Sequence, residues 1–329
     1  MKKAIYPILV LLSLLLWQGC SGSDEAEDEP IVMPIVLYVA VGDGGPVGRA
    51  PGDPGIPQNF QLPRYLYAYF VQKLSSAPGG QATYNMDVMR EELDPKLWKK
   101  VSDPNIEGLY AYAGNLSMLL SKEDILATNP AGTETEESRV YAITSYEPLT
   151  FDAPASYAAV PDLQLDLTKN APNLDLLNIY ANPLGDPNRK NGAVSKKGKF
   201  LYETKITCYH VAARIDIQWD INPALHDTYK LKTLKVNDVP QKGYFFKHTE
   251  NVATPGNTLT FTASPGNQWY GRNVFYAFDK KKVECTYILN KKGEPGGTIS
   301  IPKTYDTPSP DSASKVYSSW YRINAQLGY

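Results

Sequence analysis

The stretch that decides the fold is His210–Ile221, which reads HVAARIDIQWDI. From Val211 onward every second residue is apolar, and the positions between them include Arg214, Asp216 and Gln218. This period of two is that of a β-strand with one buried and one solvated face, and helical spacing would not produce it. We therefore predict a strand here, with its apolar face turned into a core and His210 outward as a satisfied residue of the surface or rim.

Similar alternation recurs along the rest of the chain, with Gly- and Pro-rich turns between the segments. The 23 tyrosines, 26 prolines and 24 glycines favour a β-rich, turn-rich chain over a helical one. Two short helices are predicted, at Asp94–Lys100 and Lys122–Thr128. Further strands are predicted at Arg64–Lys73, Arg139–Tyr146, Leu163–Leu167, Lys230–Val236, Thr258–Thr262, Asn273–Phe278, Val283–Leu289 and Tyr317–Leu327.

The polar stretch Asn182–Lys199 separates two groups of predicted strands. We therefore expect an N-terminal domain over residues 31–190 and a C-terminal domain over residues 191–329. The fold class predicted is mostly β, with two antiparallel β-sandwich domains in tandem and a few short helices.

The segment Ile31–Val41 (IVMPIVLYVAV) is apolar on both faces of an extended strand. Such a strand needs cover on both sides, as it has between sheets or in the groove of another protein. A loop over residues 42–55 follows, in which Gly and Pro are too dense for regular structure. Arg49 is the only basic residue of this loop.

Residues 1–19 have the layout of an export signal, with Lys2 and Lys3 before an apolar run that is too short to span a bilayer. Gly19-Cys20 resembles a lipobox junction, at which the Cys20 thiol takes a lipid that anchors the chain to a membrane. Residues 20–30 form an acidic tether. This tether either resembles the signal that sends lipoproteins to the outer face of the outer membrane or is a plain linker.

Several classes of function find no support in the sequence. The net charge of −2 gives no electrostatic case for nucleic acid. His210, His226 and His248 do not pair with other ligands at metal-site spacing, and no nucleophile motif is present. We therefore predict no enzyme, no metal and no cofactor. Cys208 and Cys285 are either buried thiols or one disulfide.

The order of several segments resembles that of the fimbrillin family of Bacteroidetes, the subunits of type V pili. The lipoprotein signal and the apolar first strand come first, and they are followed by Arg49-Ala50, Leu62–Val71 and His210–Trp219. The resemblance implies two transthyretin-like β-sandwich domains, with surface delivery as a lipoprotein. It also implies that an arginine-specific protease cuts the loop after the first strand, which opens a groove for the strand of a neighbouring subunit.

On this resemblance the cut falls between Arg49 and Ala50, and Arg64-Tyr65 is a poorer second site because it begins a strand. The strand removed carries Ile31, Met33, Ile35, Leu37, Val39 and Val41. The other reading is an edge-covering strand that never leaves, as in an uncleaved anchor subunit. The expected partners are other fimbrial subunits, the protease, and the outer membrane through the lipid on Cys20.

No apolar strand follows Leu327 in this sequence, which ends at Tyr329. That favours a tip or accessory subunit, unless Tyr317–Leu327 is itself the donor strand. A rival function is a glycan-binding surface lipoprotein, because exposed aromatic rings stack on sugars; surface glycans or proteins are then the ligands. The candidate rings are Trp98, Trp269, Tyr270, Trp320 and Tyr321, although such residues also serve as core or cross-strand pairs.

Overall fold

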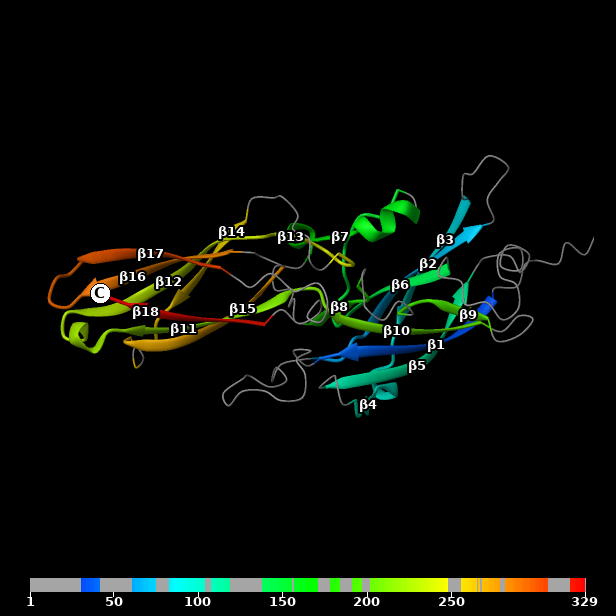
Figure 1. The fold of residues 1–329 in the computed structure, drawn as a ribbon, viewed down its shortest axis with the longest axis horizontal. Coiled ribbons are helices and arrows are strands. Elements are labelled where there is room, and N and C mark those ends of the chain that lie inside the picture. Colours follow the sequence, from blue (N-terminus) through cyan, green and yellow to red (C-terminus); the bar gives the residue numbers. More distant parts are fainter. Residues whose placement is uncertain are drawn as a thin grey trace, which may run out of the picture.

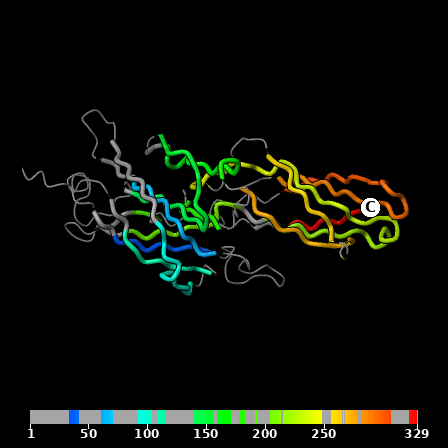
Figure 2. The backbone as a smooth tube through the Cα atoms, turned by 180° about the vertical axis from the view of Figure 1, so that it is seen from behind, coloured from blue at the N-terminus to red at the C-terminus, as the bar shows by residue number. Residues whose placement is uncertain are grey.

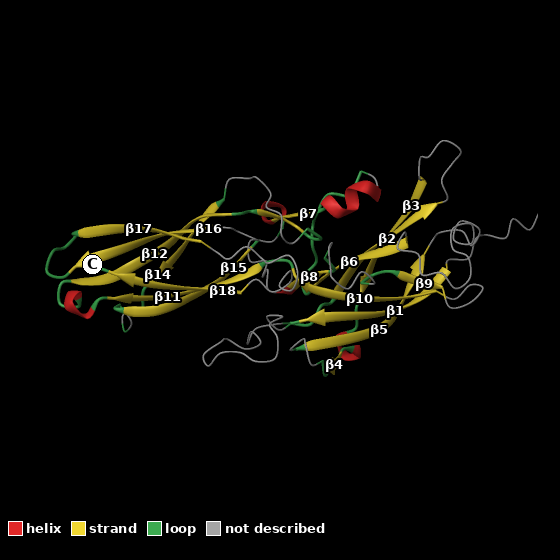
Figure 3. Ribbon diagram, in the orientation of Figure 1, coloured by secondary structure: helices red, strands yellow, loops and turns green. Residues whose placement is uncertain are grey.

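The computed structural model describes residues 31–41, 61–74, 83–103, 108–118, 138–155, 157–170, 178–183, 191–196, 202–247, 256–264, 266, 268–278, 282–306 and 320–328. Over these residues the chain forms two β lobes placed end to end, with a few short 3-10 helices between strands (Figures 1 and 3). No helix in the described part is long and apolar enough to cross a membrane.

The first lobe is built from one nine-stranded sheet in the order β3-β2-β6-β8-β10-β1-β5-β4, with β9 added to β10. Its strands are β1 (Ile31–Ala40), β2 (Tyr65–Leu74), β3 (Thr83–Glu92), β4 (Lys99–Val101), β5 (Leu109–Met118), β6 (Ser138–Ser145), β8 (Ile179–Ala181), β9 (Val194–Lys196) and β10 (Tyr202–His210).

This sheet folds over on itself, because inward side chains of β2 and β6 share one buried cluster with those of β1 and β10. Leu66 and Val140 come from one half of the sheet, and Leu37 and Ile206 come from the other. All four are 0% exposed. The first lobe is therefore a sandwich in which β10 belongs to both layers, pairing with β1 over most of its length and with β8 at its end.

The second lobe consists of two facing sheets, one in the order β15-β11-β18 and the other in the order β14-β12-β16-β17 (Figure 2). Alternate residues of β11, among them Ile217 and Trp219, enter the core between the sheets. The strands are β11 (Ala213–Ile221), β12 (Tyr229–Val239), β14 (Asn257–Thr262), β15 (Tyr270–Ala277), β16 (Lys282–Lys291), β17 (Thr298–Asp306) and β18 (Trp320–Leu327).

A third buried cluster joins the two lobes. Tyr67 and Tyr69 on the outer side of β2 share it with Phe245 and Phe246, which follow a strand of the second half of the chain. A small sheet of β7 (Gln164–Asp166) and β13 (Lys242–Tyr244) lies beside this cluster and pairs the two halves directly. The 3-10 helices are η2 (Pro95–Leu97), η3 (Tyr157–Asp162), η4 (Leu167–Lys169) and η6 (Pro223–Leu225).

The prediction of a mostly β chain with two sandwiches and a few short helices is confirmed, but the sheets are not purely antiparallel. β1 runs parallel to β10, and β18 runs parallel to β11. The helix expected at Asp94–Lys100 is reduced to η2, where the Asp94 carboxylate accepts a hydrogen bond from the Lys96 backbone N–H. The helix expected at Lys122–Thr128 lies outside the described residues.

The lobes also divide at a different place from the one expected. The strands β9 and β10 hydrogen-bond within the first sheet, so the division falls after His210 rather than between residues 190 and 191. The single strand predicted over His210–Ile221 is two strands, because the chain bends at Val211 and Ala212 before β11 begins. Both residues of the bend are buried in the cluster between the lobes.

Candidate functional site

β1 occupies an interior position in the first sheet. It pairs antiparallel with β5 over ten positions, from Ile31 opposite Met118 to Ala40 opposite Leu109. On its other edge it pairs parallel with β10 over five positions, from Ile35 opposite Thr204 onward. Figure 1 shows β1 between these two neighbours. Withdrawal of β1 would therefore leave two unpaired strand edges facing each other.

Pro34 lies where β1 has only one neighbour. It stands opposite Asn115 of β5, one residue before the pairing with β10 begins. Proline has no backbone N–H to donate, so it is tolerated in a strand only where one side lacks a ladder partner. The sequence of β1 thus agrees with its pairing on both edges.

One face of β1 is fully committed to the core. The side chains of Ile35, Leu37, Val39 and Val41 are between 0% and 2% exposed and belong to the first-lobe cluster. On the other face Val36 and Tyr38 are only half-buried. We expected β1 to be buried on both faces. In the structure, its described side chains are fully buried on one face and partly buried on the other. Ile31 and Met33 lie in the strand, but their side chains are outside the described part.

β10 forms one side of the position that β1 fills. Cys208 is 0% exposed, stands opposite Val39 and packs in the same cluster. Burial raises the pKa of its thiol well above the ordinary range, so the group is protonated and unreactive at neutral pH. Cys285 is buried in the core of the second lobe and forms no disulfide. Of the two alternatives for these cysteines, the structure has separate buried thiols.

His210 fixes the end of β1. Its Nε2 lies 3.1 Å from the Val41 carbonyl oxygen, and because a carbonyl only accepts, Nε2 is the donor. The imidazole packs against Tyr180, with 4.6 Å between ring centroids. The expectation that His210 lies at the surface or rim is wrong, since it is 8% exposed and lies beside the bend between the lobes. Val41 is further tied by its N–H, which donates to the Gly108 carbonyl at 3.0 Å.

Replacing His210 with alanine is expected to loosen β1 without unfolding the second lobe. The buried Val41 carbonyl would lose a donor, and such a loss costs about 1–3 kcal/mol. The rate at which a thiol reagent labels Cys208 should rise accordingly. His226→Ala is the matched control, because His226 bonds to the Ile221 carbonyl in the second lobe. Equal labelling rates for H210A and the unaltered chain would contradict the role assigned to His210.

The two predicted cleavage residues, Arg49 and Ala50, and the predicted lipid-bearing Cys20 lie outside the described residues. The second candidate, Arg64, is described, and its backbone is fully engaged. Its N–H donates to the Ser145 carbonyl at 2.8 Å, and its carbonyl accepts from Leu93 at 2.7 Å. A protease needs an extended, accessible segment, so a bonded peptide at the start of β2 makes a poor substrate. The structure at Arg64 thus agrees with the expectation that Arg64-Tyr65 is a poorer cleavage site than Arg49-Ala50.

Sequence reasoning identified β1 but missed its neighbours β5 and β10. Alternation of Ile206 and Cys208 with Lys205 and Thr207 was a usable signal for β10, but it lies directly after the polar stretch taken as a boundary. Parallel pairing joins residues far apart in the chain, so no local pattern reveals it. Among the described residues, no group of three or more His, Cys, Asp or Glu side chains is arranged to hold a metal ion.

No protein-family model matches the chain. No curated protein sequence matches it either. Among solved structures, a candidate cell adhesion protein from Bacteroides eggerthii aligns with a TM-score of 0.51 and 13% identity, covering 92% of this chain and 88% of that one. Two fimbrial proteins from Porphyromonas gingivalis align at lower TM-scores. The anchor protein Mfa2 gives 0.38 at 12% identity, covering 89% of this chain and 90% of that one. A truncated tip protein, Mfa3, gives 0.35 at 8% identity, covering 82% and 81%.

The Bacteroides eggerthii structure spans nearly the whole of both chains. The two proteins therefore share a fold.

Proposed function

We propose that this chain is a structural and adhesive subunit of a cell-surface fimbria, a type V pilus, in which β1 is an exchangeable strand. It would reach the outer membrane as a lipoprotein anchored through Cys20, and an arginine-specific protease would cut between Arg49 and Ala50. The observation that carries the proposal is the interior position of β1, paired on both edges; in the sequence that follows, residues 42–55 contain Arg49 as their single basic residue.

The physics of exchange follows from what β1 leaves behind. Each buried aliphatic side chain of β1 contributes about 1.5–3 kcal/mol through its removal from water. Loss of the strand would expose the apolar side chains of Ile206 and Cys208 beside the gap and the ladder edges of β5 and β10. A strand with apolar side chains at alternate positions would restore both the apolar packing and the backbone hydrogen bonds. This mode of recognition is β-augmentation. The partner expected is therefore a strand of another fimbrial subunit.

A tip or accessory position is supported by how the last strand is used. β18 pairs with β11 over eight positions, and its Ile323 and Leu327 are buried in the core of its own lobe. Every strand in the described part of the chain is paired within the same molecule. No described strand is therefore spare for donation, so this subunit would accept a strand rather than supply one.

The Cys208 thiol offers a direct test. In the purified Cys20→Ser chain, a maleimide should leave Cys208 unlabelled before cleavage. After an arginine-specific protease has cut the chain, Cys208 should become reactive, and a synthetic Ile31–Val41 peptide should protect it again. Cys285 is 1% exposed in the other lobe and should stay unlabelled throughout. Continued protection of Cys208 after cleavage and removal of the released fragment would sink the proposal, as would simultaneous labelling of both thiols.

A further inference from the structure

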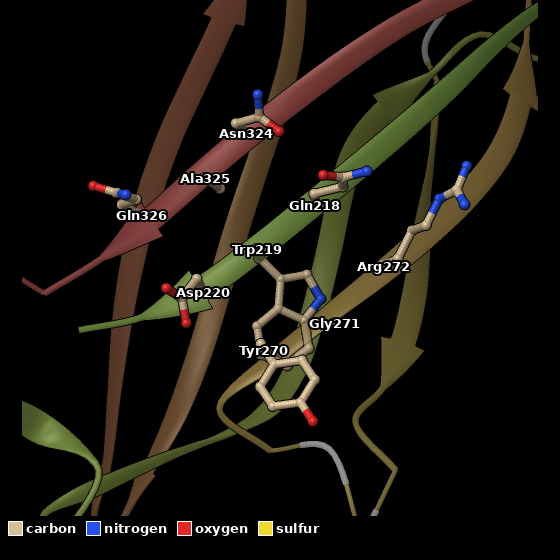
Figure 4. A pocket seen from close by; sticks show the side chains of 9 residues that line it. All are labelled: Gln218, Trp219, Asp220, Tyr270, Gly271, Arg272, Asn324, Ala325 and Gln326. Carbon is tan, nitrogen blue, oxygen red and sulfur yellow. The ribbon is translucent and has the colours of Figure 1, made fainter. Parts of the chain in front are cut away.

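The outward face of the three-stranded sheet β15-β11-β18 carries a cavity that the assembly role does not use. Because Ile217, Trp219 and Ile221 of β11 point into the core, the residues between them point outward. The pairing register then sets two rows of three side chains across the sheet (Figure 4). One row is Arg272, Gln218 and Asn324, and the other is Tyr270, Asp220 and Gln326.

These two rows, together with Trp219, Gly271 and Ala325, line a shallow cavity of about 690 Å³. Strand spacing and residue rise give the two rows an extent of about 10 Å by about 7 Å. Binding sites for small molecules have volumes of roughly 300–1,000 Å³, so the cavity is large enough for a ligand of a few rings.

Among the described side chains of this face, Tyr270 is the aromatic ring most exposed to solvent. Its side chain is 60% exposed, the highest value among the exposed large apolar side chains of the described residues. The other described aromatic candidates are engaged. Trp98 is buried and donates from Nε1 to the Pro63 carbonyl, and Trp269 is half-buried and donates to the His226 carbonyl. The side chains of Trp320 and Tyr321 are outside the described part.

Gly271 gives the neighbouring Trp219 indole room to pack against β15. A Cβ at Gly271 would lie 2.4 Å from the Trp219 ring, so only glycine lets that ring lie flat against β15 on the core side. The Trp219 Nε1 donates to the Asn273 side chain at 3.0 Å and is thereby satisfied. Trp219 thus packs beneath the sheet, while Tyr270 remains above it.

The polar groups around Tyr270 suit hydroxyl groups. The amides of Gln218, Asn324 and Gln326 each combine a donor and an acceptor, and the exposed carboxylate of Asp220 only accepts. A sugar hydroxyl both donates and accepts, so neighbouring hydroxyls can bond to an amide and a carboxylate together. A tyrosine ring presents an apolar face on which the C–H groups of a sugar ring can stack.

The charges of this part of the face give no net attraction for an acidic ligand. The Arg272 guanidinium donates from Nε and Nη2 to both carboxylate oxygens of Asp216, at 2.8 and 2.6 Å. Asp216 is 0% exposed, so this pair neutralises the only cation among the residues that line the cavity. Asp220 remains as an exposed negative charge. Arg322 of β18 stands opposite Asp216, so the two arginines and the two aspartates of this part of the face cancel and offer no net positive charge to an anion.

Other ligand classes fit this face less well. A stable protein interface buries more than about 1,000 Å² around an apolar centre, and here a single ring is surrounded by polar groups. Nucleic acid would need a basic face. We propose that the outward face of β15-β11-β18 binds a neutral carbohydrate, with Tyr270 as the stacking platform and Gln218, Asp220 and Asn324 bonding to hydroxyls.

This proposal goes beyond subunit assembly and does not depend on it, since the face lies on the second lobe and requires no cleavage. The test uses the purified uncleaved chain with lactose, maltotriose and mannotriose as neutral probes and sialyllactose as an acidic one. Saturation-transfer NMR and titration calorimetry would detect binding. At least one neutral probe should bind, and Tyr270→Ala should weaken that binding about tenfold or more.

Two further variants make the test specific. Tyr270→Phe keeps the ring and should retain affinity within about threefold. Ile299→Ala, which trims a 40% exposed side chain on β17 of the other sheet, should change nothing. The proposal would be overturned by binding of none of the neutral probes, by binding of sialyllactose alone, or by equal affinity of Y270A and the unaltered chain. Each of these results leaves the Cys208 cleavage test unaffected.

Discussion

Replacing Arg49 with alanine is expected to leave residues 20–49 attached to the chain and to abolish its incorporation into surface polymers. Without the basic residue, an arginine-specific protease finds no other base in the loop over residues 42–55. β1 then stays covalently linked between β5 and β10, and a linked strand competes with any incoming one at very high effective concentration. Immunoblots of sheared surface fractions, with intact mass of the extracted chain, would measure both effects.

Two variants control for charge and position. Arg49→Lys keeps the charge and should still block an arginine-specific protease. Arg64→Ala removes the competing candidate and should leave cleavage and polymer formation unchanged, because the Arg64 backbone is bonded to Ser145 and Leu93. If R49A were incorporated as efficiently as the unaltered chain, exchange of β1 could not be the route of assembly.

Leu37 and Leu66 offer a paired test of whether β1 is present in the assembled form. Both side chains are 0% exposed in the first-lobe cluster, one on β1 and the other on β2. Replacing either with alanine should lower the free energy of unfolding of the uncleaved chain by about 2–5 kcal/mol, since each change leaves a cavity. Urea unfolding followed by pulsed labelling of Cys208 would report the first lobe separately from the second.

After assembly the two variants should differ in their resistance to urea. A subunit extracted from polymers would lack Leu37, so Leu37→Ala should leave its resistance to urea unchanged. Leu66 remains in every form, so Leu66→Ala should lower the resistance to urea of both the uncleaved chain and the polymerised subunit. Equal destabilisation of the polymerised subunit by the two substitutions would mean that β1 stays in place.

The second lobe shows how far period-two alternation reaches. Ile215, Ile217, Trp219 and Ile221 were predicted to share a face, and all four lie in one core cluster. The same alternation misled at the other end of the stretch. Val211 is apolar because it is buried between the lobes, not because it continues the strand. An apolar residue in the sequence does not reveal whether it is buried at a bend or in a sheet.

The candidate assembly strand was predictable in type but not in position. The apolar character of Ile31–Val41 indicated a buried strand, since few other structures can accommodate it. Its neighbours were not predictable, because β5 and β10 lie far along the chain and β10 pairs in parallel. The tie from His210 to Val41 joins residues 169 positions apart, and no local pattern encodes such a contact.

The aromatic residues illustrate a different limit. Trp98, Trp269 and Tyr270 were equal candidates for a sugar platform in the sequence. Exposure separates them, and exposure depends on neighbours such as Pro63 and His226 that accept the indole hydrogen bonds. The outward rows around Tyr270 depend on the register of three strands, which follows only from the assembled sheet.

The most direct measurement of the central claim is the N-terminus of the chain taken from the cell surface. Protein extracted from surface polymers should be analysed by N-terminal sequencing and intact mass. We expect a chain that begins at Ala50 and lacks residues 31–41. A chain that begins at lipidated Cys20 and retains β1 would contradict the central claim, and would identify an anchored subunit whose first strand never leaves.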